Sequence, residues 1–313
     1  MHWTDRIGRR VRLRDLHILL AVAQWGSMAK AAEHLAISHP VISKTISDLE
    51  RALGVRLLDR SSQGVEPTVY GREVLNCSVA VFDELRQGMK RIEFLADPTA
   101  GELRIGSSDP LMAGFVPAVI DRLTRANSRI VVHTIQGTVA DLHRALRERK
   151  IDLVIARQRH SPSDQELAEE LLFYEPLFVV TGMQNPWARR PKISLADLID
   201  EPWIMLPAES VAGPLIVDAF RECGLPMPRT AVVSDSIPLR NSLLATGRFL
   251  TVFARSTLHF TAKHLSLKVL PVKFPIESRP IVIVTLKNRT MVPVAQLFIE
   301  HARAVAKSMN NVP

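Results

Sequence analysis

Long apolar segments are missing from this chain of 313 residues. No uninterrupted apolar run reaches the roughly 18 to 20 residues that a membrane helix needs, and the charged N-terminal segment lacks the apolar centre of a signal peptide. Cysteine is scarce as well. Cys77 and Cys223 lie far apart and outside any metal-ligand spacing, which argues against a disulfide framework and a cysteine metal site. We therefore expect a cytoplasmic protein with free thiols and no membrane partner.

Motifs of catalysis are also absent. The sequence contains no Gly-x-Ser-x-Gly nucleophile motif, no Gly-rich phosphate loop and no His-Glu-x-x-His zinc motif. His259 and His264 are five residues apart, a poor spacing for one helical face, so we interpret them as surface or packing residues. The sequence thus predicts no catalytic residue, no cofactor and no metal, although a two-lobed α/β enzyme stays open as an alternative.

Positive charge is in excess. The formal net charge is +8 and the pI is about 9.9, which favours polyanionic partners such as DNA, with a basic protein lacking such a partner equally open. Residues 1–72 hold 11 Lys and Arg against 7 Asp and Glu, a net charge of +4. A solvated basic tail or a DNA-attracting arm explains this excess, whose main contributors are Arg6, Arg9, Arg10, Arg12 and Arg14.

Residues 12–68 are predicted to form three short helices and two short strands. Gly26 ends the first helix and Ser27 can cap the second. Ser38 or His39 can cap the third, with Pro40 in its first turn, where the missing N–H does no harm. Short helices joined by a three- to four-residue turn are typical of a helix-turn-helix. The buried face of the third helix is marked by Ile42, Ile46, Leu49 and Leu53.

The opposite face of that third helix carries short hydrogen-bonding side chains and one cation, which suit base edges and phosphates in a major groove. Free backbone N–H groups near Ser27 and at the start of the third helix can meet phosphates. Arg60 and the turn at 61–64 would form a wing that reaches a neighbouring groove. The DNA-binding candidates are Ser27, Ser38, His39, Pro40, Ser43, Lys44, Ser47 and Arg60.

One long helix is predicted over residues 70–97, and alternating strands and helices follow it to about residue 309. The long helix has a heptad seam, which favours dimerisation over packing on its own domain: Leu75, Ser78, Phe82, Leu85, Met89, Ile92 and Ala96. The alternation beyond it predicts mainly parallel sheets covered by helices, in two α/β lobes. Its strands are predicted at 103–106, 130–135, 151–156, 177–181, 203–206, 231–234, 250–253, 267–271 and 281–286, with helices at 111–126 and 139–149.

An ordered set of motifs in residues 26–71 closely resembles the LysR-type transcriptional regulators. The Gly-Ser-x-x-x-Ala-Ala-x-x-Leu motif lies at residues 26–35, Ser-x-Pro-x-Ile-Ser at 38–43 and Leu-Glu-x-x-Leu-Gly at 49–54. Leu-x-x-Arg at 57–60 and Thr-x-x-Gly at 68–71 complete the set. His39 departs from the common Gln, which puts the bases read in doubt, and Leu58 replaces a common Phe. Tyr70 before Gly71 resembles the subgroup that regulates galactose-binding-protein and protocatechuate operons.

The resemblance implies a fold and a division into domains. A winged helix-turn-helix would occupy residues 1–69, a linker and dimerisation helix 70–98, and a two-lobed periplasmic-binding-protein-like α/β effector domain 99–313. Lobe one is expected at 102–159 and 270–305, and lobe two at 162–266, with crossovers near 158–161 and 266–269. The small-molecule effector would bind in the interlobe cleft, where the candidates are Ser107, Ser108, Thr138, Pro207, Ser210 and Ser236.

Each effector candidate has a simpler reading, because Ser and Thr at helix starts are often plain N-caps. Phe253 or Arg255 are further candidates, and the sequence does not place Arg157, Arg159 or Arg279 relative to the cleft. The family also implies partners: promoter DNA with interrupted inverted repeats, RNA polymerase, and further copies of the chain in a homotetramer that is a dimer of dimers. The rivals are an enzyme, an architectural DNA-binding protein without effector and a periplasmic binding protein.

Overall fold

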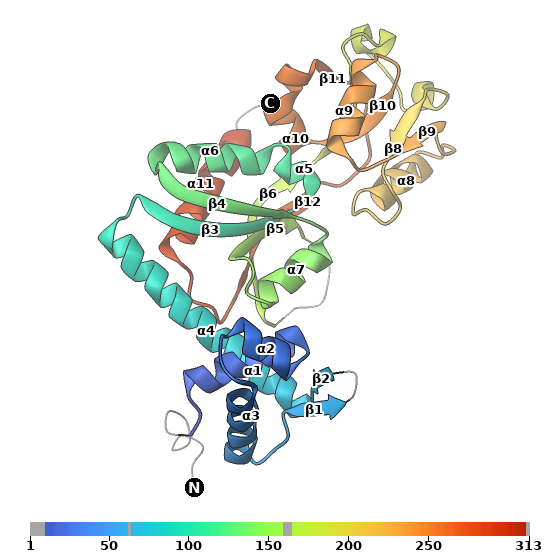
Figure 1. The fold of residues 1–313 in the computed structure, drawn as a ribbon. Coiled ribbons are helices and arrows are strands. Elements are labelled where there is room, and N and C mark those ends of the chain that lie inside the picture. The colour runs from blue at the N-terminus through green and yellow to red at the C-terminus, as the bar shows by residue number, and fades with distance from the viewer. Residues whose placement is uncertain (1–9, 62–63, 159–164, 311–313) are drawn as a thin grey trace. The chain divides into compact units, whose positions relative to one another are not determined.

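The computed structural model describes residues 10–61, 64–158 and 165–310 (Figure 1). The chain divides into two compact units, the first ending at Met89 and the second beginning at Lys90. In the described ranges, no helix combines the length and the apolar character that crossing a bilayer requires. Arg6 and Arg9 of the predicted basic arm lie outside the described residues.

Three helices form the core of the first unit: α1 (Leu13–Trp25), α2 (Met28–His34) and α3 (His39–Leu53). Gly26 and Gly54 follow α1 and α3 with φ of 60° and 74°, a left-handed conformation that favours glycine and ends a helix. Ala31 is fully buried where α2 contacts its neighbours, and Ile42 and Ile46 of α3 are equally buried in the same cluster. The predicted helix-turn-helix core is therefore confirmed.

A two-stranded wing follows, made of β1 (Leu58–Ser61) and β2 (Gly64–Pro67), which pair antiparallel. The long helix α4 (Val69–Ala96) begins directly after it. Thr68 caps this junction, since its hydroxyl donates to the Arg56 carbonyl and accepts from the Gly71 N–H. A Cβ at Gly71 would lie 2.0 Å from the Leu57 carbonyl oxygen, so only glycine fits there. Ser62 and Gln63 at the wing tip lie outside the described residues.

The predicted seam of α4 divides into two stretches. Leu75 packs against the helix-turn-helix core, and the Phe82 ring lies 5.9 Å from the ring of His17. Further along, Leu85, Met89 and Ile92 are exposed by 48%, 64% and 68%. The seam thus serves its own domain at one end and stays uncovered at the other.

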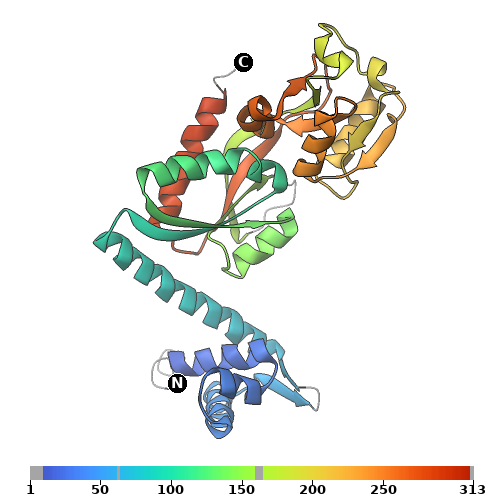
Figure 2. The same ribbon diagram turned by 45° about the horizontal axis from the view of Figure 1, so that its top comes forward.

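The second unit contains two sheets, which we call lobe one and lobe two (Figures 1 and 2). The lobe-one sheet has the strand order β4-β3-β5-β12-β6, with β3, β4 and β5 parallel and β12 antiparallel to both β5 and β6. Its elements are β3 (Ala100–Ser107), α5 (Asp109–Met112), α6 (Phe115–Ala126), β4 (Arg129–Gln136), α7 (Val139–Arg147), β5 (Leu153–Arg157), β6 (Leu167–Glu175), β12 (Arg279–Leu286) and α11 (Pro293–Asn310).

Alternation along the strands covers both faces of this sheet. Leu153 and Ile155 of β5 pack in the cluster with α6 and α11, whereas Val154 and Ala156 pack in the cluster with α7. Because successive strand side chains point to opposite faces, a continuously apolar strand must be covered on both sides. Figure 1 shows α6 and α11 on one face and α7 on the other.

The lobe-two sheet has the order β11-β7-β10-β8-β9. Helix α8 packs on one face through Ile216 and Phe220, and α9 and α10 pack on the other through Ile237, Leu244 and Leu258. Its elements are β7 (Leu177–Gly182), η2 (Pro186–Arg189), η3 (Ala196–Leu198), β8 (Trp203–Met205), α8 (Gly213–Glu222), β9 (Thr230–Val233), α9 (Ile237–Ala245), β10 (Leu250–Ala254), α10 (Arg255–Leu265) and β11 (Leu267–Val269).

The lobe limits differ from those expected from the sequence. Strand β6, expected in lobe two, pairs with β12 in the lobe-one sheet, so the first crossover follows Glu175. Strand β11 pairs with β7 in lobe two, and Leu270 still packs in the lobe-two core. The second crossover therefore lies beyond Leu270 and before β12, later than expected. Both sheets are mixed rather than mainly parallel, because each crossover strand runs antiparallel to its neighbours.

The helix predicted over residues 111–126 is interrupted between α5 and α6. A Cβ at Gly114 would lie 2.3 Å from the Ser256 carbonyl oxygen of α10, so the chain approaches lobe two closely at this point. The Thr257 hydroxyl donates to the Pro110 carbonyl at 3.0 Å, and Phe260 packs against the lobe-one core. Helix α10 therefore packs against lobe one, although it is part of lobe two.

Candidate functional site

The outward face of α3 carries the polar side chains predicted to meet DNA. His39, Pro40 and Lys44 are exposed, and Ser43 and Ser47 are half-buried beside them. Ile42 and Ile46 on the same helix have no exposed surface. The helix is therefore anchored by one face and presents a polar face at its N-terminal end, where free backbone N–H groups favour anions.

Ser27 and Ser38, which precede α2 and α3, differ in whether their side chains cap the helix. The Ser27 hydroxyl accepts from the Lys30 N–H at 3.4 Å and so acts as the N-cap of α2. Ser38 occupies the N-cap position of α3, but its side chain makes no capping hydrogen bond, and the residue is exposed. Arg60 is exposed on β1 of the wing. Arg10 of the basic arm is exposed too.

A cavity of about 810 Å³ lies between the two lobes of the second unit. Lobe one contributes chain segments that follow β3 and β4 and the ends of β5 and β6. Lobe two contributes the segment before α8, the start of α9 and the end of β10. Helix N-termini and strand ends therefore converge on one space, an arrangement typical of ligand sites in α/β proteins.

Three of the six predicted effector residues line this cavity: Ser108, Thr138 and Ser210. Ser108 stands at the N-cap position of α5 without a capping bond. The Thr138 hydroxyl caps α7 by accepting from the Asp141 N–H at 3.2 Å. The Ser210 hydroxyl closes a turn between the Pro207 carbonyl and the Gly213 N–H. Two of the three hydroxyls thus also serve local structure.

The other three predicted residues are not among those that line the cavity. Ser107 is fully buried, and its hydroxyl donates to the Ile155 carbonyl at 2.7 Å. Pro207 contributes its carbonyl to the turn closed by Ser210. Ser236 caps α9, while its neighbours Asp235 and Ile237 line the cavity. Residues adjacent to each of these three, namely Ser108, Leu206 and Ala208, and Asp235 and Ile237, do line the cavity.

Arg240 is a cavity residue that the sequence analysis did not identify. Its side chain lies on α9 and is almost fully buried, with its guanidinium 4.2 Å from the centre of the Phe253 ring. The guanidinium donates to the Thr251 hydroxyl and to the Val252 carbonyl. Burial lowers the pKa of Arg240 to about 10, against the opposing effect of two carboxylates, so the side chain stays cationic at neutral pH. Those carboxylates belong to Asp109 and Asp235.

Arg157 and Glu175 form a second charged group on the cavity wall. Both Glu175 oxygens accept from Ser256, from its N–H at 2.9 Å and its hydroxyl at 2.8 Å. Burial raises the pKa of Glu175, although these hydrogen bonds and the nearby arginines oppose the shift. Burial also lowers the pKa of Arg157; the negative charge of Glu175 opposes this shift, and the positive charge of Arg279 adds to it. A sequence pattern gives no signal for this group, because its members come from three separate segments.

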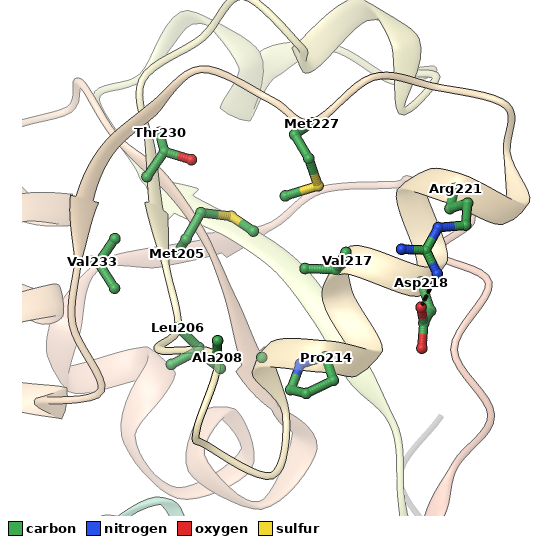
Figure 3. Close-up of a pocket in the computed structure, with 11 residues that line it drawn as sticks. Met205, Leu206, Ala208, Pro214, Val217, Asp218, Arg221, Met227, Thr230 and Val233 are labelled. Atoms are coloured by element: carbon green, nitrogen blue, oxygen red, sulfur yellow. Dashed lines mark hydrogen bonds and ion pairs between the residues drawn. The ribbon is translucent and has the colours of Figure 1, made fainter.

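A second hollow of about 490 Å³ lies on lobe two between α8 and the edge strand β9 (Figure 3). Its surface is mostly apolar, with Met205, Met227 and Val217 facing it. The charged pair at its rim, Asp218 and Arg221, is joined by a 2.9 Å hydrogen bond and is exposed. This hollow therefore offers shape and apolar surface but few polar groups to orient a ligand. Among the described residues, no group of His, Cys, Asp and Glu side chains is placed to hold a metal ion.

Comparison with known proteins covers almost the whole chain. Residues 13–72 match the family model of the bacterial regulatory helix-turn-helix proteins of the lysR family, and residues 96–307 match the LysR substrate binding domain. The transcriptional regulator GbpR of Azospirillum brasilense is 28% identical over 95% of this chain and 87% of its own length. The regulator PcaQ of Agrobacterium fabrum is 25% identical over 88% of each chain. Both are compatible with the predicted subgroup.

A solved structure has the same fold. Full-length CbnR in a complex with its target DNA covers 95% of this chain and 100% of its own, with 22% identity and a TM-score of 0.53. The curated relatives are named as transcriptional regulators rather than enzymes, which disfavours the enzyme alternative. Two family models in the order helix-turn-helix then substrate-binding domain account for both units. The chain belongs to the LysR family of DNA-binding transcriptional regulators.

Proposed function

We propose that α3 is the recognition helix and enters the major groove of promoter DNA. The observation that carries this proposal is the division of α3 into a buried apolar face and an exposed polar face. His39, Ser43, Lys44 and Ser47 would contact base edges and nearby phosphates. Ser27, Ser38 and Pro40 would place helix N-termini at the DNA backbone, and Arg60 would reach from the wing into the next groove.

Pairing of chains through α4 is the second part of the proposal. The exposed row of Leu85, Met89 and Ile92 is an apolar strip that a second copy of the helix can cover. Two-fold pairing matches two half-sites of an inverted repeat. We propose a tetramer built from two such dimers, acting in the cytoplasm and contacting RNA polymerase at the promoter.

The interlobe cavity is proposed as the effector site, with Ser108, Thr138 and Ser210 at its wall and Ser107, Pro207 and Ser236 supporting the wall from behind. A ligand held by both lobes favours one lobe arrangement, and that preference changes how the assembly holds DNA. The domain limits 1–69, 70–98 and 99–313 suit this division of labour. Within the last domain, residues 100–175 and 279–310 form lobe one and residues 177–270 form lobe two.

A gel mobility shift tests the proposed recognition helix. The DNA is the region upstream of the chain's own gene, and the proteins are wild type and the double variant Ser43→Ala/Lys44→Ala. We expect a discrete, competitor-resistant complex with wild type only, because both changed side chains lie on the outer face of α3 and not in the core. Arg86→Ala is a matched control, since it removes an exposed cation from α4 and should leave the complex unchanged.

Two results would contradict the proposal. Equal binding by wild type and the double variant would show that α3 does not read sequence on this DNA. Binding that occurs only at low salt and yields to competitor DNA would reduce the interaction to nonspecific attraction by the basic arm.

A further inference from the structure

Arg157 has a buried guanidinium nitrogen whose hydrogen bond is not made within the described part of the chain. Its Nη1 is buried and has no hydrogen-bond acceptor among the described residues, and the side chain lines the interlobe cavity at the end of β5. A buried donor without an acceptor costs about 1–3 kcal/mol, and more when it is charged. Because this atom lies at a cavity wall, it can donate a hydrogen bond to a molecule in the cavity.

Glu175 lies close enough to interact electrostatically with Arg157, but both of its oxygens already accept hydrogen bonds from another residue. Its two oxygens accept from Ser256, so the carboxylate caps the start of α10. Arg255 also acts on Glu175, and Arg279 acts on Arg157 with the same sign of charge. Two guanidinium groups therefore act on the Glu175 carboxylate and a third acts on Arg157, so positive charge is in excess in this part of the cavity.

The surroundings of Arg240 are different. Its guanidinium is held by Thr251 and Val252 and lies on Phe253, and the carboxylates of Asp109 and Asp235 act on it electrostatically. The positive charge of Arg240 is therefore balanced by the carboxylates of the protein itself. An anionic ligand group thus has a place beside Arg157 and meets negative charge beside Arg240.

We propose that the effector is a small carboxylic acid and that Arg157 binds its carboxylate. This inference rests on the proposed function of the cavity as the effector site. A guanidinium donates two parallel hydrogen bonds to a carboxylate, which fixes both position and orientation. The remainder of the acid faces an apolar wall that includes Leu177, Phe253 and Ile281, and the cavity of about 810 Å³ has room for an aromatic ring or a short chain.

Matched acid and amide probes test this on the full-length chain. Benzoate, phenylacetate and succinate are each compared with the corresponding amide by thermal unfolding and by titration calorimetry. We expect at least one acid to bind wild type more tightly than its amide does. In Arg157→Met, the binding of that acid falls about ten-fold or more, and Arg157→Lys recovers part of the loss because it keeps the charge but not the fork. Arg248→Met, which removes an exposed cation outside the cavity, should bind the acid like wild type.

The stability of the ligand-free variants separates binding from a structural role. If Arg157 is kept for a ligand, Arg157→Met should unfold at the same temperature as wild type or higher, because the substitution removes a buried donor that has no acceptor. A large fall in the unfolding temperature would assign Arg157 to the structure instead and overturn the proposal.

Binding outcomes are equally decisive. The proposal fails if no acid binds better than its amide, or if the advantage of the acid persists in Arg157→Met. If the amides bind as well as the acids, the cavity can still be the effector site, but the effector does not need a carboxylate. The proposed DNA-binding function is tested separately by the gel shift, so the two failures are distinguishable.

Discussion

The carboxylate of Asp109 accepts a hydrogen bond from the backbone N–H of Ile237, with 3.3 Å between Oδ2 and N. Asp109 begins α5 of lobe one and Ile237 begins α9 of lobe two, so this bond joins the lobes at the rim of the cavity. The other oxygen of Asp109 accepts from the Gln136 amide at 3.0 Å. A side chain of lobe one therefore occupies the N-terminal end of a lobe-two helix, where negative charge is favourable.

Removal of this link should loosen the start of α9. In Asp109→Ala the Ile237 N–H loses its acceptor, and a net hydrogen bond of about 1 kcal/mol corresponds to roughly five- to ten-fold faster amide exchange. Hydrogen exchange of a peptide covering residues 235–239 measures the change. Asp109→Asn keeps an acceptor oxygen and should exchange like wild type. Unchanged exchange in Asp109→Ala would show that the bond does not hold the lobes together in solution.

The exposed part of the α4 seam should be needed for oligomer formation. Ile92→Asp places a charge in the strip that a partner helix would cover, so the mass measured by light scattering should fall. Ile92 is a better position than Phe82, whose ring contacts His17 within its own domain. Arg91→Asp changes the neighbouring exposed residue off the seam and should keep the wild-type mass. An unchanged mass in Ile92→Asp would exclude this strip as the interface.

The buried ion pair of lobe one should be a strong determinant of its stability. Arg289 donates to the Asp152 carboxylate at 2.9 Å, and the two side chains are exposed by only 6% and 7%. Asp152 also accepts from the Arg104 N–H. Because Arg289→Met removes the cation that is paired with a buried carboxylate, we expect a loss of about 3–5 kcal/mol in the free energy of unfolding. Urea unfolding measures it, and a loss below about 1 kcal/mol would contradict the assignment.

A half-exposed pair should give a small stability term that depends on pH. Arg303 on α11 donates two hydrogen bonds to Glu170 on β6, at 2.6 and 2.8 Å, and these lower the pKa of Glu170 below its ordinary value of 4.5. The pair therefore stabilises the fold above pH 4.5, and this contribution is lost as the pH falls through the lowered pKa. Solvent screening limits the contribution to about 1 kcal/mol or less.

Unfolding followed from pH 7 into the acid range, in wild type and in Arg303→Gln, checks this term. The two curves should differ at pH 7 and converge at low pH, and added salt should reduce the difference. Curves that stay parallel down to low pH would show that the pair is not the source. Arg125→Gln is the control variant. It removes an arginine whose partner, Asp121, is four residues away on the same exposed helix face, so that pair does not join separate elements of the fold.

Local patterns determined the first unit and the order of elements in the second. Gly26, Gly54 and the spacing of Ile42 and Ile46 are signals that act within a few residues, since left-handed glycines end helices and a 3.6-residue period defines a buried face. The strand ends beside the cavity were likewise found from runs of apolar residues. The family motifs in residues 26–71 identify the chain as a regulator without reference to its fold.

Only the tertiary structure decided where the chain crosses between the lobes and which charged side chains become neighbours. Strand β6 has mixed polarity, because one of its faces packs on the core while the other is partly open, so its partner β12 could not be read from its sequence. Arg157, Glu175 and Ser256 are separated by 18 and 81 residues or more and become neighbours only when β5, β6 and α10 pack together. Electrostatic interaction depends on distance and burial, not on position along the chain. The sequence therefore determined that this protein binds DNA, and packing determined which cavity arginine has a buried nitrogen without a hydrogen-bond acceptor among the described residues.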